Sequence, residues 1–445
     1  MEIITTMKKD FSLYASRRKD LASAVYQEHK KDGVIILFAG FENERIRFRQ
    51  ESSFYYYTGI TEPGCVAVIE ADGKTTLWIP HTTTKRAQWV EADIPLISDN
   101  AKKFNLQAIQ FLGGQSFGYQ FHPFFVLEEY EYFIEFLHEC LRNNQTIFTL
   151  NPTDAASYAE QRLVLERLQK FVSDFSVQDI SPLVHAARRR KDMHEIELLY
   201  RAIDITALAQ EAAARAIAEG VNEAEVQASL EYMMTGSQAR IAFPSIVAGG
   251  KNGTILHYSS NNASLQNSDL VVVDIGAEYE YYCADITRTY PVTGQFSARQ
   301  RELYTLVLQT QQYVADLAKP GYWLSNKEHP EKSLHHLAKK FLDDRGYGRY
   351  FVHGIGHFLG LDVHDVGNYK EPLQEGDVFT IEPGIYIPEE NIGIRIEDNY
   401  WVAKDTVVCL SEHLPKSITE IESLMREAKD SDDEFFEEDE NEMAH

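Results

Sequence analysis

Four acidic side chains in the second half of the chain occur within or beside apolar runs, which is an unusual place for charge. Asp274 ends the run VVVD, Glu382 interrupts the run VFTIEPG, and Asp285 and Glu397 follow them at short intervals. Burying a carboxylate is costly unless the group is paired or bound to a metal ion. The four positions are therefore candidate metal ligands.

The spacing of these acids suggests two pairs. The midpoint of Asp274 and Asp285 falls at the centre of the sequence EYEY, and the midpoint of Glu382 and Glu397 falls at the centre of PEEN. If both sequences are hairpin turns, the members of each pair lie directly opposite each other on adjacent strands, with Cβ atoms about 5 Å apart. We expect the same geometry in both hairpins.

Two pairs of facing carboxylates would repel and destabilise the domain without a cation. Their combined charge of about −4 would be neutralised by two divalent ions, so this count favours a dinuclear centre over a single metal ion. His357 offers a nitrogen ligand, and oxygen ligands with one imidazole suit manganese, cobalt, iron or zinc better than copper. The alternative, solvated acids on surface hairpins, is disfavoured because VVVDIG and VFTIEPG have the composition of buried strands.

Three histidines lie in the sequence HGIGHFLGLDVHDVG, which begins at His353 and includes His357 and His364. His353 and His357 have the spacing of a zinc-binding helix. However, Gly354 and Gly356 would each cost about 1 kcal/mol in a helix interior. The glycines also miss the spacing of a dinucleotide-binding loop, so we expect a loop that brings His357 to the acids.

The elements that must position these residues occur twice. Asp192, Asn222 and Ser297 are each followed three positions later by Glu or Gln, a capping-box pattern that predicts helix starts. The strand sequences SDLVVVDIG and GDVFTIEPG align at an offset of 108, which matches Asp274 with Glu382. This repetition predicts a domain of two related halves with acidic strands facing each other.

The first part of the chain has a different character. The runs VIILFAG, CVAVIEA and TTLWIP predict strands and EEYEYFIEFLHEC predicts a helix, an alternation typical of an α/β domain. The basic segment HAARRRKD then marks a change of composition. We expect an N-terminal domain over residues 1–176, a C-terminal domain over 177–427, and a disordered acidic tail over 428–445.

Composition excludes several classes of protein. The sequence has no apolar run of membrane-spanning length and no secretory signal near its start, so we expect no membrane partner. The four cysteines are widely scattered, which is typical of reduced thiols in a cytoplasmic protein. The formal net charge of −25 argues against nucleic acid as a partner.

The ordered set Asp274, Asp285, His357, Glu382 and Glu397 resembles the ligands of the pita-bread metallopeptidases, which include aminopeptidase P, prolidase and methionine aminopeptidase. Further similar sequences are ILHY, DITRTY, HGIGHFLGLDVHDVG, TIEPGIY and IGIRIED. The upstream sequence RFRQESSFYYYTGITEPGCVAVIEADG resembles the N-terminal domain of the proline-specific members, which methionine aminopeptidases usually lack.

The resemblance implies an α/β (α+β) fold in which an aminopeptidase-P-like domain precedes a catalytic pita-bread domain with a pseudo-twofold repeat and a curved antiparallel sheet. It also implies the metal ligation. Asp285 and Glu397 would bridge two divalent ions, Asp274 would bind one ion, and His357 with Glu382 would bind the other. Mn²⁺ is expected, with Co, Fe or Zn as alternatives.

The resemblance also implies catalytic roles. A hydroxide bridging the metals would be the nucleophile, and Glu382 would accept its proton. His257 and His364 would flank the metals and stabilise the oxyanion or carry protons. His353 would line the proline pocket, and Arg395, on the same strand face as Glu397, would orient its neighbours or bind substrate.

The function implied is that of a Xaa-Pro aminopeptidase, which removes the residue before proline from the N-terminus of a peptide. Prolidase, an Xaa-Pro dipeptidase, is the alternative, because FRQES followed by EPGC is as similar to one enzyme as to the other. The short gap between Glu382 and Glu397 favours the aminopeptidase or the bacterial form of the dipeptidase. A non-catalytic, chaperone-like binding module is the third possibility, although such modules have generally lost metal ligands. The resemblance further suggests a homodimer or homotetramer.

Overall fold

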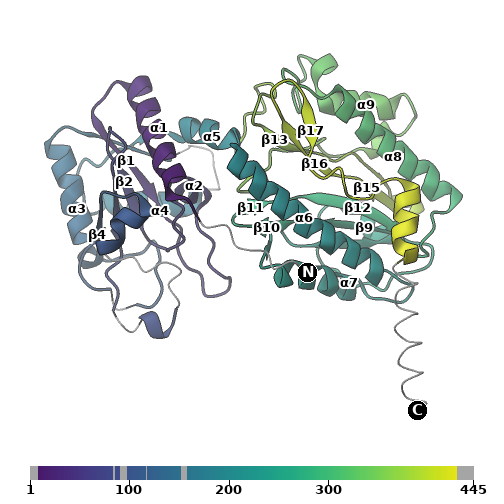
Figure 1. The fold of residues 1–445 in the computed structure, drawn as a ribbon, viewed down its shortest axis with the longest axis horizontal. Coiled ribbons are helices and arrows are strands. Elements are labelled where there is room, and N and C mark those ends of the chain that lie inside the picture. The colour runs from purple at the N-terminus through teal and green to yellow at the C-terminus, as the bar shows by residue number, and fades with distance from the viewer. Residues whose placement is uncertain (1–8, 84–85, 91–97, 117, 152–157, 428–445) are drawn as a thin grey trace, which may run out of the picture. The chain divides into compact units, whose positions relative to one another are not determined.

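The computed structural model describes residues 9–83, 86–90, 98–116, 118–151 and 158–427. The chain forms two compact units, residues 1–188 and 189–445, which are described separately (Figure 1). The acidic tail predicted over 428–445 lies outside the described residues. Among the described helices, none combines the length and the apolar character needed to cross a bilayer.

Unit 1 is an α/β domain built on a six-stranded mixed sheet of order β4-β3-β2-β1-β5-β6. The strands are β1 (Gly33–Phe38), β2 (Val66–Ile69), β3 (Thr75–Ile79), β4 (Ala108–Phe111), β5 (Thr146–Thr149) and β6 (Gln178–Asp179). The helices are α1 (Phe11–His29), α2 (Ser52–Thr58), α3 (Leu127–Arg142), α4 (Ala159–Gln169) and α5 (Ser181–Arg189). Its core packs β1, β2 and β3 against α3 and α4. The three predicted strands and the predicted aromatic helix are all present.

Unit 1 extends 12 residues beyond position 176, where the sequence analysis placed the domain boundary. β6 pairs in parallel with β5 and so adds a strand to the edge of the sheet. α5 follows directly, and the Tyr56 hydroxyl donates to the Ala187 carbonyl at 3.2 Å. These contacts attach the segment after position 176 to unit 1.

Unit 2 contains two helix pairs, each followed by antiparallel strands. The first half comprises α6 (Met193–Ala216), α7 (Glu223–Gly236), β7 (Arg240–Ile241), β8 (Ile246–Gly249), β9 (Leu270–Ile275), β10 (Ala277–Tyr279), β11 (Tyr282–Cys283) and β12 (Ile286–Pro291). The second half comprises α8 (Ala298–Leu317), α9 (Leu334–Asp343), β13 (Val378–Ile381), β14 (Gly384–Ile387), β15 (Ile392–Arg395), β16 (Asp398–Val402) and β17 (Val407–Cys409). The predicted repeat of two helices and a set of strands is therefore present.

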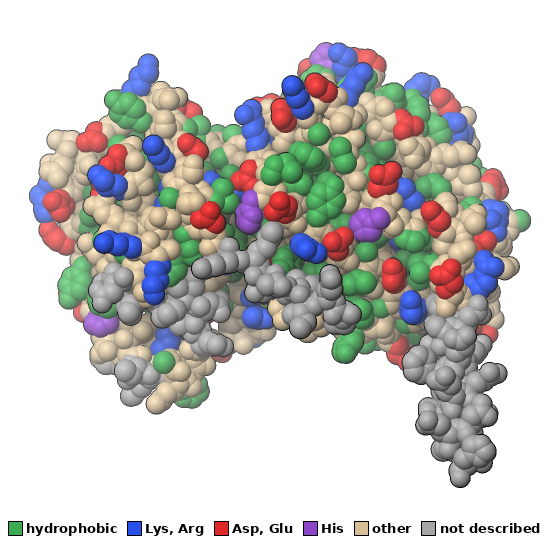
Figure 2. Space-filling model, in the orientation of Figure 1, with side chains coloured by type: hydrophobic (Ala, Val, Ile, Leu, Met, Phe, Trp, Pro, Cys, Tyr) green, Lys and Arg blue, Asp and Glu red, His purple; other side chains and the backbone are tan. Residues whose placement is uncertain are grey.

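The local sequence explains where the helices of unit 2 begin. Asp192, Asn222 and Ser297 each form the predicted capping box, in which the side chain accepts from a first-turn N–H and Glu or Gln three residues later returns a bond. The long helices α6 and α8 then pack against the strands of their own halves (Figure 1). On the face that Figure 2 shows, acidic and basic side chains are interspersed over this unit.

Hydrogen bonds join the two halves at the inner edges of their strands. The Glu397 N–H donates to the Thr287 carbonyl at 3.1 Å, and the Arg395 N–H donates to the Thr289 hydroxyl at 3.2 Å. This junction brings β12 of the first half beside β15 and β16 of the second. The acidic residues of both hairpins consequently meet at one place.

Candidate metal centre

The first acid pair does not have the predicted geometry. In the ladder of β9 with β12, Asp274 lies opposite Thr287, and not opposite Asp285. Asp285 precedes Thr287 by two positions, so both project from the same face of the sheet. The two aspartates are therefore diagonal neighbours, and the prediction that they face each other directly is wrong.

The turn between β10 and β11 explains the difference. Glu280 and Tyr281 form a two-residue turn in which both φ angles are positive, 46° and 75°, as in the type I′ turn that matches the strand twist. The centre of this turn lies one residue beyond the centre of the sequence EYEY. A displacement of one residue at the centre shifts the partner of Asp274 by two positions, which keeps Asp285 on the same face.

The second acid pair has the predicted geometry. The register of β13 with β16 and the register of β14 with β15 continue each other, and both place Glu382 opposite Glu397. The turn falls at Pro388–Glu390, as the midpoint predicted. Thr380, two positions before Glu382, donates from its hydroxyl to the Glu382 carboxylate at 3.5 Å.

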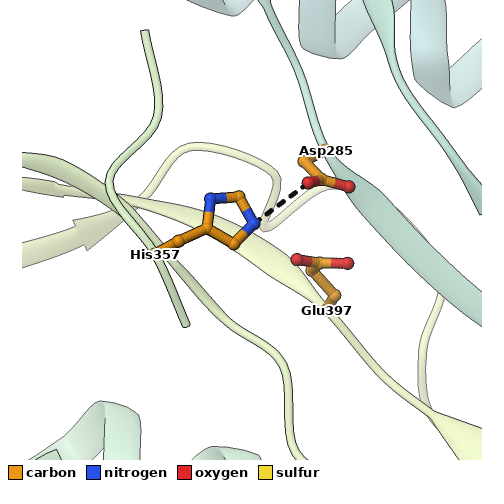
Figure 3. A group of neighbouring side chains, drawn as sticks. All are labelled: Asp285, His357 and Glu397. Atoms are coloured by element: carbon orange, nitrogen blue, oxygen red, sulfur yellow. Dashed lines mark ion pairs between the residues drawn. The ribbon is translucent and has the colours of Figure 1, made fainter. Parts of the chain in front are cut away.

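Asp285, His357 and Glu397 converge on one point between the two hairpins (Figure 3). One ligand atom from each lies within 4.8 Å of those of the other two. His357 Nε2 is 3.2 Å from Asp285 Oδ2 and 3.7 Å from Glu382 Oε1. Glu382 therefore belongs to the same cluster.

The loop after α9 brings His357 to this cluster by running alongside β13. The Thr380 N–H donates to the His357 carbonyl at 2.9 Å, and the Glu382 N–H donates to the Ile355 carbonyl at 2.9 Å. A Cβ at Gly356 would overlap the Thr380 carbonyl oxygen. Glycine at this position therefore allows the close approach that directs His357 at the acids.

Asp274 joins the site through Arg395. Arg395 Nη2 donates to Asp274 Oδ2 at 2.6 Å, while Nη1 donates to the Tyr386 hydroxyl at 2.7 Å. The other carboxylate oxygen, Asp274 Oδ1, is buried and has no hydrogen-bond partner. A buried carboxylate oxygen without a partner is what a metal ligand presents before its ion is bound.

Burial and mutual repulsion raise the pKa values of three of these acids. Burial, together with the charge of Asp274, raises the pKa of Asp285 to about 6. Burial likewise raises the pKa of Glu382 to about 7, although His357 and Arg395 oppose the shift. Burial and the charge of Asp285 hold the pKa of Glu397 well above its ordinary range. The site as folded therefore favours positive charge at its centre.

The pKa values of the histidines in the site are shifted in opposite directions. Burial lowers the pKa of His357, but the hydrogen bond and charge of Asp285 outweigh burial and raise it to about 9. His364 stacks on His357 with ring centroids 4.1 Å apart. Loss of hydration and the neighbouring His357 and His257 lower the pKa of His364 to about 4. Burial and Arg395 also lower the pKa of His353 to about 4.

A cavity of about 780 Å³ contains every residue predicted for the site. Its polar lining includes His257, Asp274, Asp285, His353, His357, His364, Glu382, Arg395 and Glu397. Its apolar lining includes Ala242, Phe243, Pro244, Ile246, Leu256 and Val363. A lining that combines apolar side chains with a few polar groups is typical of a site that binds a small organic group in a fixed orientation.

The sequence analysis missed three residues that organise the site. Tyr386 receives a hydrogen bond from Arg395 and contacts His353 Nε2 at 2.9 Å. Thr287 donates to Glu397 Oε2 at 2.8 Å. The buried Asn399 side chain exchanges hydrogen bonds with the Asp285 main chain.

A signal for Tyr386 was present, because residues at alternate positions along a strand share one face. Tyr386 stands two positions after Gly384 and four after Glu382, within the sequence TIEPGIY. Asn399 gave no comparable signal. Its contact with Asp285 depends on the packing of the two halves.

The donor set fits divalent cations. Four carboxylates and one imidazole converge, with Arg395 as the neighbouring cation and Asp274 Oδ1 still without a partner. Oxygen donors with one imidazole suit first-row divalent metals. Asp274, Asp285, His357, Glu382 and Glu397 are therefore the residues that would hold the metal.

The chain is similar in sequence to known metallopeptidases. The family model of metallopeptidase family M24 matches residues 197–404, and the family model of the aminopeptidase P N-terminal domain matches residues 14–112. The Xaa-Pro aminopeptidase of Haemophilus influenzae is 31% identical over 90% of this chain and 95% of that protein. The Xaa-Pro dipeptidase of Pyrococcus furiosus is 30% identical over 81% of this chain and 91% of that protein.

Solved structures show the same similarity. A structure of Escherichia coli aminopeptidase P in complex with substrate has a TM-score of 0.80 and 27% identity, covering 95% of this chain and 100% of that one. A zinc-substituted form of the same enzyme in complex with product has a TM-score of 0.79 and 28% identity, covering 95% of this chain and 99% of that one. The similarity therefore extends over both units.

Proposed function

Because the chain belongs to metallopeptidase family M24, in the group of Xaa-Pro aminopeptidases and prolidases, we propose that it removes the N-terminal residue from peptides with proline in second position. The chain is a metal-dependent exopeptidase. The observation that supports the proline specificity is the apolar part of the cavity lining, which includes Phe243, Pro244 and Ile246, in the same cavity as the acid cluster. An Xaa-Pro bond has no N–H to be recognised, so the shape of the ring must be read by such a surface.

When bound, divalent ions would polarise the scissile carbonyl and lower the pKa of a water molecule. Glu382 is suited to take the proton of the attacking water, because its carboxylate lies within the cluster, 3.7 Å from His357 Nε2. Arg395 fixes Asp274 by a hydrogen bond of 2.6 Å. Asp274 therefore keeps one oxygen for the metal.

The histidines around the acids supply hydrogen bonds. His364 has a pKa of about 4 and is neutral at pH 7, so it can donate one N–H to the developing oxyanion without adding charge. His257, on an exposed turn that lines the same cavity, can supply a second hydrogen bond to the oxyanion. His353 is held by the Tyr386 hydroxyl at 2.9 Å and presents its ring to the cavity.

The decisive experiment compares a tripeptide Xaa-Pro-Yaa with the dipeptide Xaa-Pro, using protein stripped of metal and reconstituted with Mn²⁺. We expect release of the N-terminal residue from the tripeptide and little hydrolysis of the dipeptide. Replacement of proline by alanine in the tripeptide should reduce kcat/KM strongly. Equal activity on both tripeptides would contradict proline specificity.

Prolidase activity is the second candidate. The observation that favours it is the 30% identity with the Pyrococcus furiosus Xaa-Pro dipeptidase over most of both chains. Hydrolysis of the dipeptide without hydrolysis of the tripeptide would establish prolidase activity in place of aminopeptidase activity.

We further propose Mn²⁺ as the preferred ion, a cytoplasmic location and a homo-oligomeric state. The oxygen-rich donor set supports manganese, and the scattered cysteines support a reducing compartment. Activity after reconstitution with Mn²⁺, Co²⁺, Fe²⁺ or Zn²⁺ tests the metal. Light scattering of the full-length chain tests the oligomeric state, and cell fractionation tests the location.

A further inference from the structure

Two buried glutamines, one on each long helix, hold the strands next to the acids. Gln210 of α6 is 3% exposed and Gln311 of α8 is 1% exposed. Gln210 Nε2 donates to the carbonyls of Val273 at 3.2 Å and Ile286 at 2.9 Å. Gln311 Nε2 donates to the carbonyls of Ile381 and Ile396, both at 3.2 Å. The two glutamines therefore make equivalent contacts in the two halves of unit 2.

The four accepting residues are direct neighbours of the acids. Val273 and Ile286 adjoin Asp274 and Asp285, respectively, in the first half. Ile381 precedes Glu382 and Ile396 precedes Glu397 in the second half. Each glutamine thus binds both strands of its hairpin at the level of the carboxylates.

The second hairpin shows why a side-chain donor is needed there. The Ile396 N–H donates to the Pro383 carbonyl at 3.4 Å. In a hydrogen-bonded antiparallel pair the partner residue returns a bond, but proline has no N–H to donate. Gln311 supplies the donor that Pro383 lacks, to the carbonyl of a residue that is fully buried. Gln311 of α8 therefore completes the ladder next to the facing pair of Glu382 and Glu397.

The first hairpin fixes the orientation of its glutamine. The Tyr290 hydroxyl donates to Gln210 Oε1 at 3.0 Å, so the amide group must direct its nitrogen at the strands. Tyr290 is itself only 1% exposed. An amide held at both ends is a rigid spacer between α6 and the strands that carry Asp274 and Asp285.

We propose that Gln210 and Gln311 are positioning residues for the metal centre. They set the separation of the two strands in each hairpin, and so the separation of the carboxylates that hold the ions. This inference rests on the metal centre of the proposed function but not on its substrate. Outer partners of metal ligands typically contribute about 10–100-fold to metal affinity.

The test is the variant Gln311→Met, which keeps a similar chain length and removes both N–H donors. Titration of metal-free protein with Mn²⁺, followed by electron paramagnetic resonance, should show affinity lowered by about 10–100-fold. The matched control is Gln300→Met on the same helix, because Gln300 Nε2 also donates to a backbone carbonyl, that of Ser268 at 2.9 Å. Ser268 precedes β9 and adjoins none of the four acids, so this variant should lose stability but keep its Mn²⁺ affinity.

A second change separates a lost hydrogen bond from altered packing. Pro383→Ala restores a main-chain N–H opposite Ile396. Added to Gln311→Met, it should recover part of the Mn²⁺ affinity. Gln210→Met should lower the affinity in the same way, and Gln311→Asn serves in place of Gln311→Met if the methionine variant does not fold.

The outcomes distinguish this inference from the proposed function. Mn²⁺ affinity unchanged in Gln311→Met, or lowered equally in Gln300→Met, would overturn the positioning role. Failure of Pro383→Ala to recover any affinity would also overturn it. Wild-type protein that binds Mn²⁺ but cleaves no Xaa-Pro peptide would contradict the proposed substrate and leave the positioning role intact.

Discussion

At the scale of residues, Arg395 is the cation that the acid cluster depends on when no metal is bound. It is 4% exposed and donates to Asp274, to Tyr386 and to the Thr287 hydroxyl. Burial lowers its pKa, but Tyr386 and the neighbouring acids outweigh burial and hold the pKa well above the ordinary value. Removing it leaves the buried Asp274 carboxylate without its cationic partner.

We predict that Arg395→Met lowers the free energy of unfolding of the metal-free protein by about 3–5 kcal/mol, the usual effect of breaking a buried ion pair. Saturating Mn²⁺ should restore part of the loss, because the ions then balance the acids. Urea unfolding with and without Mn²⁺ measures both effects. The control is Arg299→Met, whose exposed pair with Glu390 should contribute about 1 kcal/mol or less. Equal losses in the two variants would contradict the prediction.

The titrating groups of the site predict how the stability of the metal-free protein depends on pH. His357 has a pKa raised from 6.5 to about 9. A raised pKa means that the folded state binds the proton more tightly than the unfolded chain, so stability is lost as pH rises from 6.5 to 9. Glu397, whose pKa is also raised, acts in the same direction. His353 and His364, with pKa values lowered to about 4, oppose the loss only near pH 6.5, where the unfolded histidines still hold part of their protons.

The expected fall in the free energy of unfolding is about 1–3 kcal/mol between pH 6.5 and pH 9. Saturating metal should diminish this dependence, because bound ions require deprotonated ligands. Urea unfolding at several pH values, with chelator or with Mn²⁺, gives the comparison. Stability that increases across this window in the metal-free protein would show that the acids and His357 are not coupled as described.

At the scale of elements, α7 holds the turn that carries His257. Its first residue, Glu223, is fully buried and accepts hydrogen bonds from the Gly249 and Ala263 N–H groups and from the Tyr258 hydroxyl. Tyr258 directly follows His257 in the chain. The position of this helix therefore determines where the His257 turn lies on the cavity wall.

Two glycines near the ends of α7 are predicted to change the stability in opposite directions when each is replaced by alanine. Gly220 has a φ of 81°, in the left-handed region, so Gly220→Ala should destabilise unit 2 by about 1 kcal/mol. Gly236, the last helical residue, has open space around its position, so Gly236→Ala should stabilise by about 0.5–1 kcal/mol. Thermal unfolding of both variants checks the pair, and a destabilised Gly236→Ala protein would contradict it.

At the scale of the whole molecule, every residue of the metal cavity belongs to unit 2. A ligand that binds only the folded form of one unit stabilises that unit by about 2.7 kcal/mol at 100 times its dissociation constant. The two units should therefore differ in their response to metal.

We predict that calorimetry of the full-length chain shows a transition that moves to higher temperature with added Mn²⁺ and a transition that does not. The first corresponds to unit 2 and the second to unit 1. Limited proteolysis during heating identifies the unit that unfolds at each step. Equal shifts of both transitions would show that the units unfold together and that metal binding stabilises them jointly.

The sequence alone was enough to select the residues that line the cavity and to predict the repeated plan of the domain that holds them. A carboxylate in an apolar strand is costly unless it is paired or bound to a metal ion, so Asp274 and Glu382 could be recognised as candidate ligands. The positions of the expected hairpin turns then indicated Asp285 and Glu397 as their partners. The capping boxes at Asp192, Asn222 and Ser297 are local signals that tertiary packing did not override. These features could be predicted because they depend on neighbours in the chain.

Features that depend on packing between distant segments could not be predicted from the sequence, because no local pattern specifies them. The register of the first hairpin differs from the predicted one because the turn at Glu280 and Tyr281, where both φ angles are positive, lies one residue later than the midpoint of Asp274 and Asp285. Gln210 and Gln311 gave no signal in the sequence, since a glutamine in a helix ordinarily faces solvent. Their role exists because each long helix packs against strands 63–85 positions away, where a missing or unsatisfied backbone bond needs a donor.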